Sequence, residues 1–135
     1  MILVDMNQIS LACLMMSLHM NKGELDEEMV RHMILNSIRG YRTMFKEDYG
    51  EIVLTYDSRA YWRKQVFPQY KANRKKGREE DGKDWDSIFG VLNQIKEEIR
   101  EFLPYKVVET YGAEADDVIA IVCKHYQSEQ ILIVS

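Results

Sequence analysis

Cysteine, proline and long apolar runs are all scarce in this chain of 135 residues. The two cysteines, Cys13 and Cys123, cannot form a disulfide framework, and each falls in an apolar helical pattern. Both are therefore expected to be buried free thiols in a reducing cytoplasm. No apolar stretch reaches the roughly 20 residues that cross a bilayer, and the start lacks the basic region of a signal peptide. These absences argue against a disulfide-rich secreted domain and against a membrane protein.

The composition that remains is typical of one globular domain. Hydrophobic residues make up 46% of the chain, charged residues make up 30%, and the net charge is −4. This length suits one compact domain with a sizeable core. The acidic total would disfavour a nucleic-acid partner, but the stretch from Ser58 to Arg78 holds eight basic residues and no acidic one. A local basic patch is the feature that binds a polyanion, whatever the overall charge.

Short apolar runs alternate with helical patterns along the chain. Asp26 has the position of a helix N-cap, and either Asp84 or Asp86 starts a later amphipathic helix that Pro104 stops. The alternation predicts an α/β fold, with a central parallel sheet and helices on both faces. The expected strands are 2–4, 51–56, 105–110 and 130–134, and the expected helices are 8–20, 26–45, 84–103 and 114–124.

Acidic residues follow three of the expected strands. Asp5 ends the first and Asp57 ends the second, while Glu114, Asp116 and Asp117 come shortly after the third. Because the carboxyl ends of parallel strands share one edge, these side chains are expected to gather in one crevice. Carboxylates repel one another unless a cation joins them, and hard oxygen ligands suit Mg²⁺ or Mn²⁺. The pattern predicts a metal site in which two ions serve phosphate chemistry.

Each acidic site also has a plainer interpretation when it is taken alone. A single Asp after a strand is often a turn residue or a helix cap. Acids in the first turn of a helix are favoured by the helix dipole, which explains Asp116 and Asp117 without any ligand. Three strand-end acidic sites in one chain favour the metal hypothesis over these separate explanations.

The segment from about residue 58 to 83 is basic, aromatic and irregular. Arg and Lys neutralise phosphates, and aromatic rings offer stacking faces for unpaired bases. The alternative is a solvated basic loop with aromatic residues packed beneath it. We expect an excursion from the domain body that contacts nucleic acid through Arg59, Tyr61, Trp62, Arg63, Lys64, Tyr70, Lys75, Lys76 and Arg78.

Several motifs of this chain occur together, and in the same order, in a known family. The chain resembles the 5′ nuclease (flap endonuclease) superfamily, and within it the ribonuclease H group of T-even-like phages. The Tyr-Lys-x-x-Arg and Glu-Ala-Asp-Asp motifs are specific in combination. The matching pieces are Leu3-Val4-Asp5, Val53-Leu54-Thr55-Tyr56-Asp57, Tyr61-Trp62-Arg63, Tyr70-Lys71-Ala72-Asn73-Arg74, Arg78-Glu79-Glu80 and Glu114-Ala115-Asp116-Asp117-Val118-Ile119-Ala120.

The resemblance implies a PIN-like 5′ nuclease catalytic domain in the host cytoplasm. It implies a Mg²⁺-dependent 5′→3′ exonuclease and flap endonuclease, with Mn²⁺ able to substitute and two ions in the complete enzyme. The substrates would be DNA and RNA–DNA hybrids with a 5′ end or flap, from which RNA primers and adjoining DNA are removed. Lys71 and Arg74 match the basic pair that positions and polarises the scissile phosphate. A single-strand-binding protein and a sliding clamp are implied partners.

The chain ends at Ser135, directly after an expected strand. Family members continue there into an Asp-x-Asp loop with further metal ligands. The expectation is that residues 1–135 are the N-terminal portion of the catalytic domain and an incomplete catalyst, either a truncated product or one half of a split enzyme that a C-terminal half completes in trans. Three alternatives stay open: a non-catalytic nucleic-acid-binding module, a PIN-type ribonuclease, and a receiver domain with Asp57 as phosphoacceptor.

Overall fold

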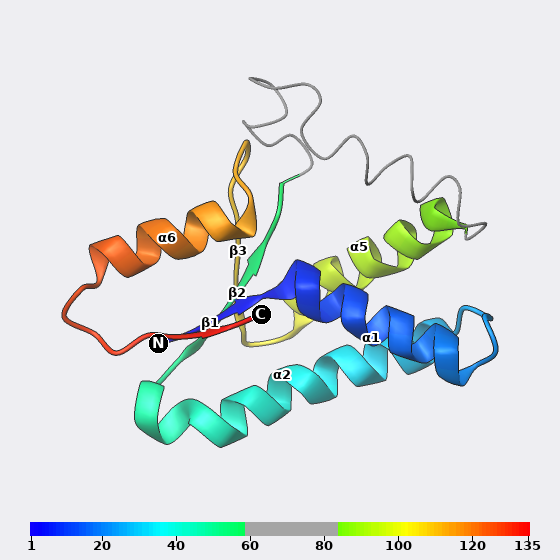
Figure 1. The fold of residues 1–135 in the computed structure, drawn as a ribbon, viewed down its shortest axis with the longest axis horizontal. Helices are drawn as coiled ribbons and strands as arrows, with labels where there is room; N and C mark the ends of the chain where they lie inside the picture. The colour runs from blue at the N-terminus through cyan, green and yellow to red at the C-terminus, as the bar shows by residue number, and fades with distance from the viewer. Residues whose placement is uncertain (59–83) are drawn as a thin grey trace.

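A four-stranded parallel sheet with four helices packed on it makes up the part of the chain that the structure describes. The computed structural model describes residues 1–58 and 84–135 (Figure 1). In chain order the elements are β1 (Ile2–Asp5), α1 (Met6–Met20), α2 (Glu27–Tyr49), β2 (Ile52–Tyr56), α5 (Trp85–Phe102), β3 (Lys106–Glu109), α6 (Ala115–His125) and β4 (Leu132–Val134).

Strand β1 lies in the middle of the sheet, whose order is β3-β2-β1-β4. Its residues are all buried, as a parallel strand with neighbours on both sides requires. The register pairs Ile2 with Ile52 of β2 and with Leu132 of β4. The hydroxyl of Thr55 donates to the backbone carbonyl of Val4 at 2.8 Å, which adds a buried hydrogen bond between β1 and β2. All three strand pairs are parallel, so their carboxyl ends share one edge.

Three helices cover one face of the sheet. Helices α1, α2 and α5 enclose the larger core together with alternate residues of the strands. On α2, the buried residues Val30, Ile34 and Ile38 recur every four positions, which gives the helix one apolar stripe. Arg31 of the same helix forms a two-pronged ion pair with Glu98 of α5, with N···O distances of 2.8 and 3.0 Å.

Helix α6 covers the other face. There Ile119 packs with Leu3 and Val53 in a smaller core, and Figure 1 shows α6 alone on that side of the sheet among the drawn helices. Helices therefore lie on both faces of a parallel sheet. The fold class predicted from the sequence is confirmed.

Most element boundaries lie within one or two residues of the predicted ones. The first helix begins at Met6 and not at Gln8, because Asp5 both ends β1 and caps α1, so no loop separates them. Asp26 caps α2 as predicted, its Oδ1 accepting the N–H of Met29 at 3.2 Å. Asp84, and not Asp86, caps α5 by accepting the N–H of Ser87 at 3.2 Å.

Both cysteines are free thiols. Cys13 is buried as predicted, with its Sγ 3.6 Å from the hydroxyl oxygen of Ser37. Cys123 is only partly buried, which corrects the prediction, because it lies on the flank of α6 at the margin of the smaller core. Within residues 1–58 and 84–135, no helix combines the length and the apolar character that crossing a membrane requires.

Candidate metal centre

The predicted acidic residues lie at the carboxyl edge of the sheet. Asp5 is the last residue of β1, and Asp57 directly follows β2. The loop after β3 leads within five residues to Glu114, the N-cap of α6, with Asp116 and Asp117 in the first turn of that helix. Three elements, β1, β2 and α6, thus deliver carboxylates to the edge where open α/β sheets bind their ligands.

Asp5 is the most buried of the aspartates at this edge, with 8% of its surface exposed. Its Oδ1 accepts the backbone N–H of Gln8 at 3.4 Å, so the capping role considered for it is real. Burial raises the pKa of the Asp5 carboxyl, and the negative charges of Asp116 and Asp57 raise it further, against backbone hydrogen bonds that lower it. The Asp5 carboxylate is therefore within electrostatic reach of two other acids that come from different elements.

Asp57 joins the end of β2 to the start of α6. Its Oδ1 accepts the backbone N–H of Ala115 at 2.6 Å, a short bond of the charge-assisted kind. The backbone N–H of Asp57 donates in turn to the side-chain oxygen of Asn7, in the first turn of α1, at 3.1 Å. Through its backbone N–H and its carboxylate, Asp57 thereby links three elements that all reach the acidic edge.

The acids at the start of α6 have different surroundings. Glu114 is 4% exposed, and its backbone N–H donates to Oδ2 of Asp117 at 3.0 Å, which closes one half of a capping box. Asp117 therefore holds the helix start. Asp116 is exposed, and its charge still contributes to the raised pKa of Asp5. Of these three acids, Asp116 is the most exposed to solution.

The donor set fits a hard divalent cation in its chemistry. Mg²⁺ and Mn²⁺ prefer carboxylate oxygens such as those gathered at this edge. The negative charges of Asp57 and Asp116 repel that of Asp5, and a bound cation would relieve this repulsion. In the part of the chain that the structure describes, no three Asp, Glu, His or Cys side chains converge on a common point where a metal ion could bind. Mg²⁺ keeps several waters and binds few carboxylates directly, so such convergence is not a requirement for it.

Two polar residues of this edge were not singled out from the sequence. Asn7 orients Asp57 as described above. Ser58 is buried, its N–H donates to the carbonyl of Ala113 at 2.9 Å, and its hydroxyl accepts the N–H of Gly112 at 3.3 Å. Asn7 and Ser58 each come two residues after the end of a strand, close to where the acids lie. The position alone could have identified them, but neither residue type suggests metal chemistry.

The basic pair Lys71 and Arg74 and the nine predicted nucleic-acid contacts all lie in segment 59–83, outside the described residues. What the structure describes is where this segment joins the body. It follows Ser58 at the carboxyl edge of the sheet and precedes Asp84, the cap of α5. The predictions on these eleven residues stay predictions.

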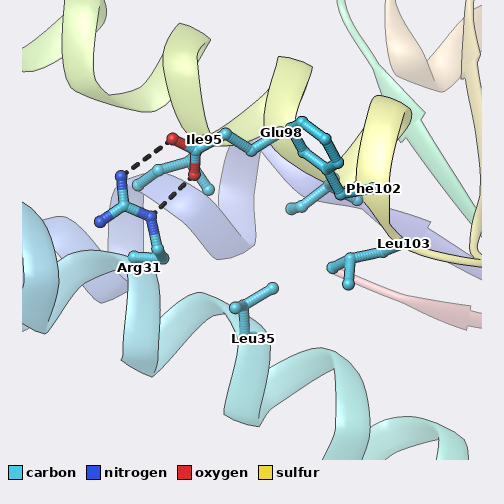
Figure 2. A pocket seen from close by; sticks show the side chains of 7 residues that line it. Arg31, Leu35, Ile95, Glu98, Phe102 and Leu103 are labelled. Atoms are coloured by element: carbon cyan, nitrogen blue, oxygen red, sulfur yellow. Dashed lines mark hydrogen bonds and ion pairs between the residues drawn. The ribbon is translucent and has the colours of Figure 1, made fainter.

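A pocket of about 270 Å³ lies elsewhere, between α2 and α5 (Figure 2). Its lining is mostly apolar, and the Arg31–Glu98 ion pair closes one side of it. None of the predicted acidic residues lines it. This pocket lies between two helices of the larger core and is not part of the acidic edge.

Solved structures with this fold include nucleases of bacteriophage T5. A T5 5′-exonuclease with bound zinc ions superposes with a TM-score of 0.70 and 16% identity, over all of this chain and 48% of the other. A T5 flap endonuclease in a pseudo-enzyme–product complex with DNA and metal ions gives a TM-score of 0.72 and 16% identity, over 99% of this chain and 47% of the other. The chain thus has the fold of the N-terminal part of phage 5′ nucleases.

The family follows from the sequence match. Residues 2–135 match the model of the 5′–3′ exonuclease N-terminal resolvase-like domain. Ribonuclease H of Enterobacteria phage T4 is 37% identical over 138 residues, a match that covers 98% of this chain and 45% of the phage protein. The chain belongs to the 5′–3′ exonuclease family, and it spans less than half the length of that relative. The resemblance drawn from the motifs is confirmed, and the receiver-domain alternative has no support.

Proposed function

We propose that this chain is the N-terminal portion of a Mg²⁺-dependent 5′ nuclease that hydrolyses phosphodiester bonds in DNA and RNA–DNA hybrids with a 5′ end or flap. In this proposal, segment 58–83 is the arch that admits the 5′ strand. The metal ligands are Asp5, Asp57, Glu114, Asp116 and Asp117, some of them through water. In replication, the complete enzyme would remove RNA primers and adjoining DNA.

The observation that carries this proposal is the placement of acids from three elements at one edge of the sheet, close enough for two of them to affect the third. Asp116 and Asp57 both raise the pKa of Asp5, although the three residues are far apart in the sequence. A fold that holds like charges together without a cation loses stability, and functional sites are where such arrangements concentrate. Membership of a nuclease family agrees with a divalent cation at this edge.

Each residue of the edge has a defined part in the proposed reaction. Mg²⁺ would neutralise the phosphate and lower the pKa of the attacking water. The bond from Ala115 to Asp57 orients that carboxylate, and Asp117 keeps the start of α6 in position so that Asp116 faces solvent. Lys71 and Arg74 would hold the scissile phosphate by charge-assisted hydrogen bonds.

The test is cleavage of a 5′-labelled flap with Mg²⁺ by the chain and by Asp116→Asn. Asp86→Asn is a matched control, because Asp86 has the same position in the first turn of α5. The same variants are placed in a chimera in which this chain replaces the matching part of T4 ribonuclease H. We expect Asp116→Asn to reduce cleavage by at least about 100-fold, as for other residues that stabilise charge in the transition state. Cleavage by this variant at the rate of the control would overturn the metal-site assignment.

A non-catalytic nucleic-acid-binding module is the second candidate. It is favoured by one observation, that no three potential ligands converge within the described residues. It predicts binding of the flap by the chain and no cleavage by the chimera at any Mg²⁺ or Mn²⁺ concentration. Cleavage by the chimera that depends on Asp116 would exclude it.

A further inference from the structure

Tyr111 is held in an exposed position beside the acidic edge. Its side chain is 83% exposed, the highest value for a large hydrophobic residue in the described parts of the chain. Its loop is tied down by three hydrogen bonds: Ala113 to Thr110, Ser58 to Ala113, and Gly112 to the hydroxyl of Ser58. Gly112 has φ of 82°, which a side chain would disfavour. The ring therefore projects from an ordered turn and not from a loose loop.

A cavity opens next to this ring. It has a volume of about 350 Å³ and is lined by Ser58, Lys96, Glu109 and Tyr111. This volume is at the lower end of the range of about 300–1,000 Å³ for pockets that bind small ligands. The space suits one planar, polar group and is too small for a duplex.

The charge of the cavity wall is balanced. Lys96 Nζ lies 2.7 Å from Oε2 of Glu109, and Nη2 of Arg100 lies 3.3 Å from Oε1. The carboxylate of Glu109 is therefore neutralised by two cations and does not repel an approaching nucleotide. It still offers acceptor oxygens, beside the donor groups of Lys96, to a polar ring edge.

A single exposed aromatic residue is common and needs no function. The surroundings of Tyr111 distinguish it. Ser58 directly follows Asp57, and Tyr111 is three residues before Glu114, so the cavity borders two of the proposed metal ligands along the chain. An aromatic face and a cavity with polar side chains in its wall thus lie next in sequence to two of the proposed metal ligands, and Ser58 ties the loop of Tyr111 to the end of β2.

We propose that Tyr111 is a stacking platform for one unpaired nucleobase of the substrate, with the cavity of Ser58, Lys96 and Glu109 receiving the edge of that base. This inference rests on the proposed function, because it requires a nucleic-acid substrate. Stacking on an aromatic ring tolerates any base, since every base has a π-face. Tyr111 would hold the strand near the metal centre and is therefore a positioning residue. It would not distinguish one base from another.

The experiment measures binding of 5′-labelled flaps by fluorescence anisotropy in Ca²⁺ for the chain, Tyr111→Ala and Tyr111→Phe. Phe102→Ala is the control, because Phe102 is also an exposed ring (73%) but ends α5 ahead of β3, at the amino edge of the sheet. Each protein is also tested on flaps with one abasic position moved along the strand. Thermal unfolding checks that every variant is folded.

We expect Tyr111→Ala to raise Kd by roughly 5- to 100-fold, the range for loss of one base–aromatic stack. Tyr111→Phe and Phe102→Ala should bind like the wild type. One abasic position should weaken wild-type binding and leave Tyr111→Ala unchanged, since the stacked base is already without its partner. The inference is overturned if Tyr111→Ala binds the intact flap as tightly as the wild type, or if each abasic position weakens binding by Tyr111→Ala as much as binding by the wild type. In either case, wild-type binding of the flap still supports the proposed function. Absence of wild-type binding overturns both.

Discussion

At the level of single residues, Asp5 combines two roles that oppose one another. As a helix cap it stabilises α1 through the N–H of Gln8. As a buried acid facing Asp57 and Asp116, it is harder to ionise in the folded chain than in the unfolded one. A carboxyl group whose pKa is raised by folding lowers stability once the pH exceeds the unfolded value. The acidic edge is thus a site where the fold gives up stability.

Asp5→Asn should therefore raise the Tm of the metal-free protein at pH 7 by a few degrees. Asn keeps an oxygen that can accept from Gln8, so the cap is retained while the charge is removed. The gain should vanish below the unfolded pKa of about 3.8, where Asp5 is protonated in both states. Thermal unfolding in EDTA at pH 7 and pH 3 measures both.

Asp26→Asn is the matched control for this charge removal. Asp26 also caps a helix, through Met29 at 3.2 Å, but it lies at α2, away from the acidic edge. Its replacement should leave Tm unchanged or slightly lower. A lower Tm for Asp5→Asn than for the wild type at pH 7 would contradict the prediction. Added Mg²⁺ should raise the Tm of the wild type more than that of Asp5→Asn.

The acids could be predicted from the sequence, but their hydrogen bonds could not. Asp5, Asp57 and Glu114 were identifiable because each comes at or after a strand end. The bond from Ala115 to Asp57 depends on how the chain returns from β3 to α6 over the edge of the sheet. That is set by packing of the whole domain, which no local pattern contains. For the same reason Asn7 was not foreseen.

At the level of elements, β3 and α5 are joined by ion pairs at the sheet edge. Burial alone raises the pKa of Glu109, but hydrogen bonds and charges from Lys96 and Arg100 lower it, and the net shift is downward. A carboxyl group whose pKa is lowered by folding adds stability above its unfolded value, here about 4.5. That stability is lost as the pH falls from there through the folded pKa.

Glu109→Gln should lower the free energy of unfolding by about 1–2 kcal/mol at pH 7, because the partly buried ammonium of Lys96 loses its nearest carboxylate, at 2.7 Å, while that of Glu97 lies farther away at 3.9 Å. The difference from the wild type should be smaller at pH 3 than at pH 7, because the contribution of the ionised carboxylate declines as the pH falls below the unfolded value of about 4.5. Urea unfolding at the two pH values measures it. An equal difference at both would mean that the contribution is packing and not charge.

The sequence predicted the order of the elements because each has a clear local signal. Apolar runs mark β1 and β2, and Asp26 and Asp84 mark helix starts by capping. The start of α1 was placed two residues too late, since the sequence pattern gave no sign that one residue could end a strand and cap a helix at once. The boundaries of helices and strands depend on such shared residues, whereas the presence of a helix or strand can be predicted from the periodicity of its apolar residues.

At the level of the whole molecule, charge is unevenly divided along the chain. Segment 59–83 holds nine basic and three acidic residues, so the other residues hold nine basic and nineteen acidic ones. The corresponding net charges are +6 and −10, which add up to the total of −4. A polyanion is attracted by the segment and repelled by the body. Segment 59–83 should therefore dominate the electrostatic part of binding.

Binding of single-stranded DNA should accordingly weaken steeply with salt. If three to eight basic residues each neutralise a phosphate, the slope of log K against log salt is about −2 to −6. Replacing Lys75 and Lys76 with Gln should make the slope shallower by about 1.4, from about 0.7 per phosphate contact on a single strand. Lys124→Gln on α6 is the control and should leave it unchanged. Anisotropy titrations at several salt concentrations measure the slopes, and equal slopes for all three proteins would contradict this account.

The central place of β1 in the sheet bears on how the chain acquires its structure. Ile2 pairs with Ile52 on one side and with Leu132 on the other, so β1 meets its second neighbour only after some 130 further residues are available. Pairings between such distant residues slow folding, because a long loop must close first. Until β4 arrives, β1 has one open edge, and open edges invite pairing with other chains. On the ribosome, this sheet should stay incomplete and prone to aggregation until β4 emerges.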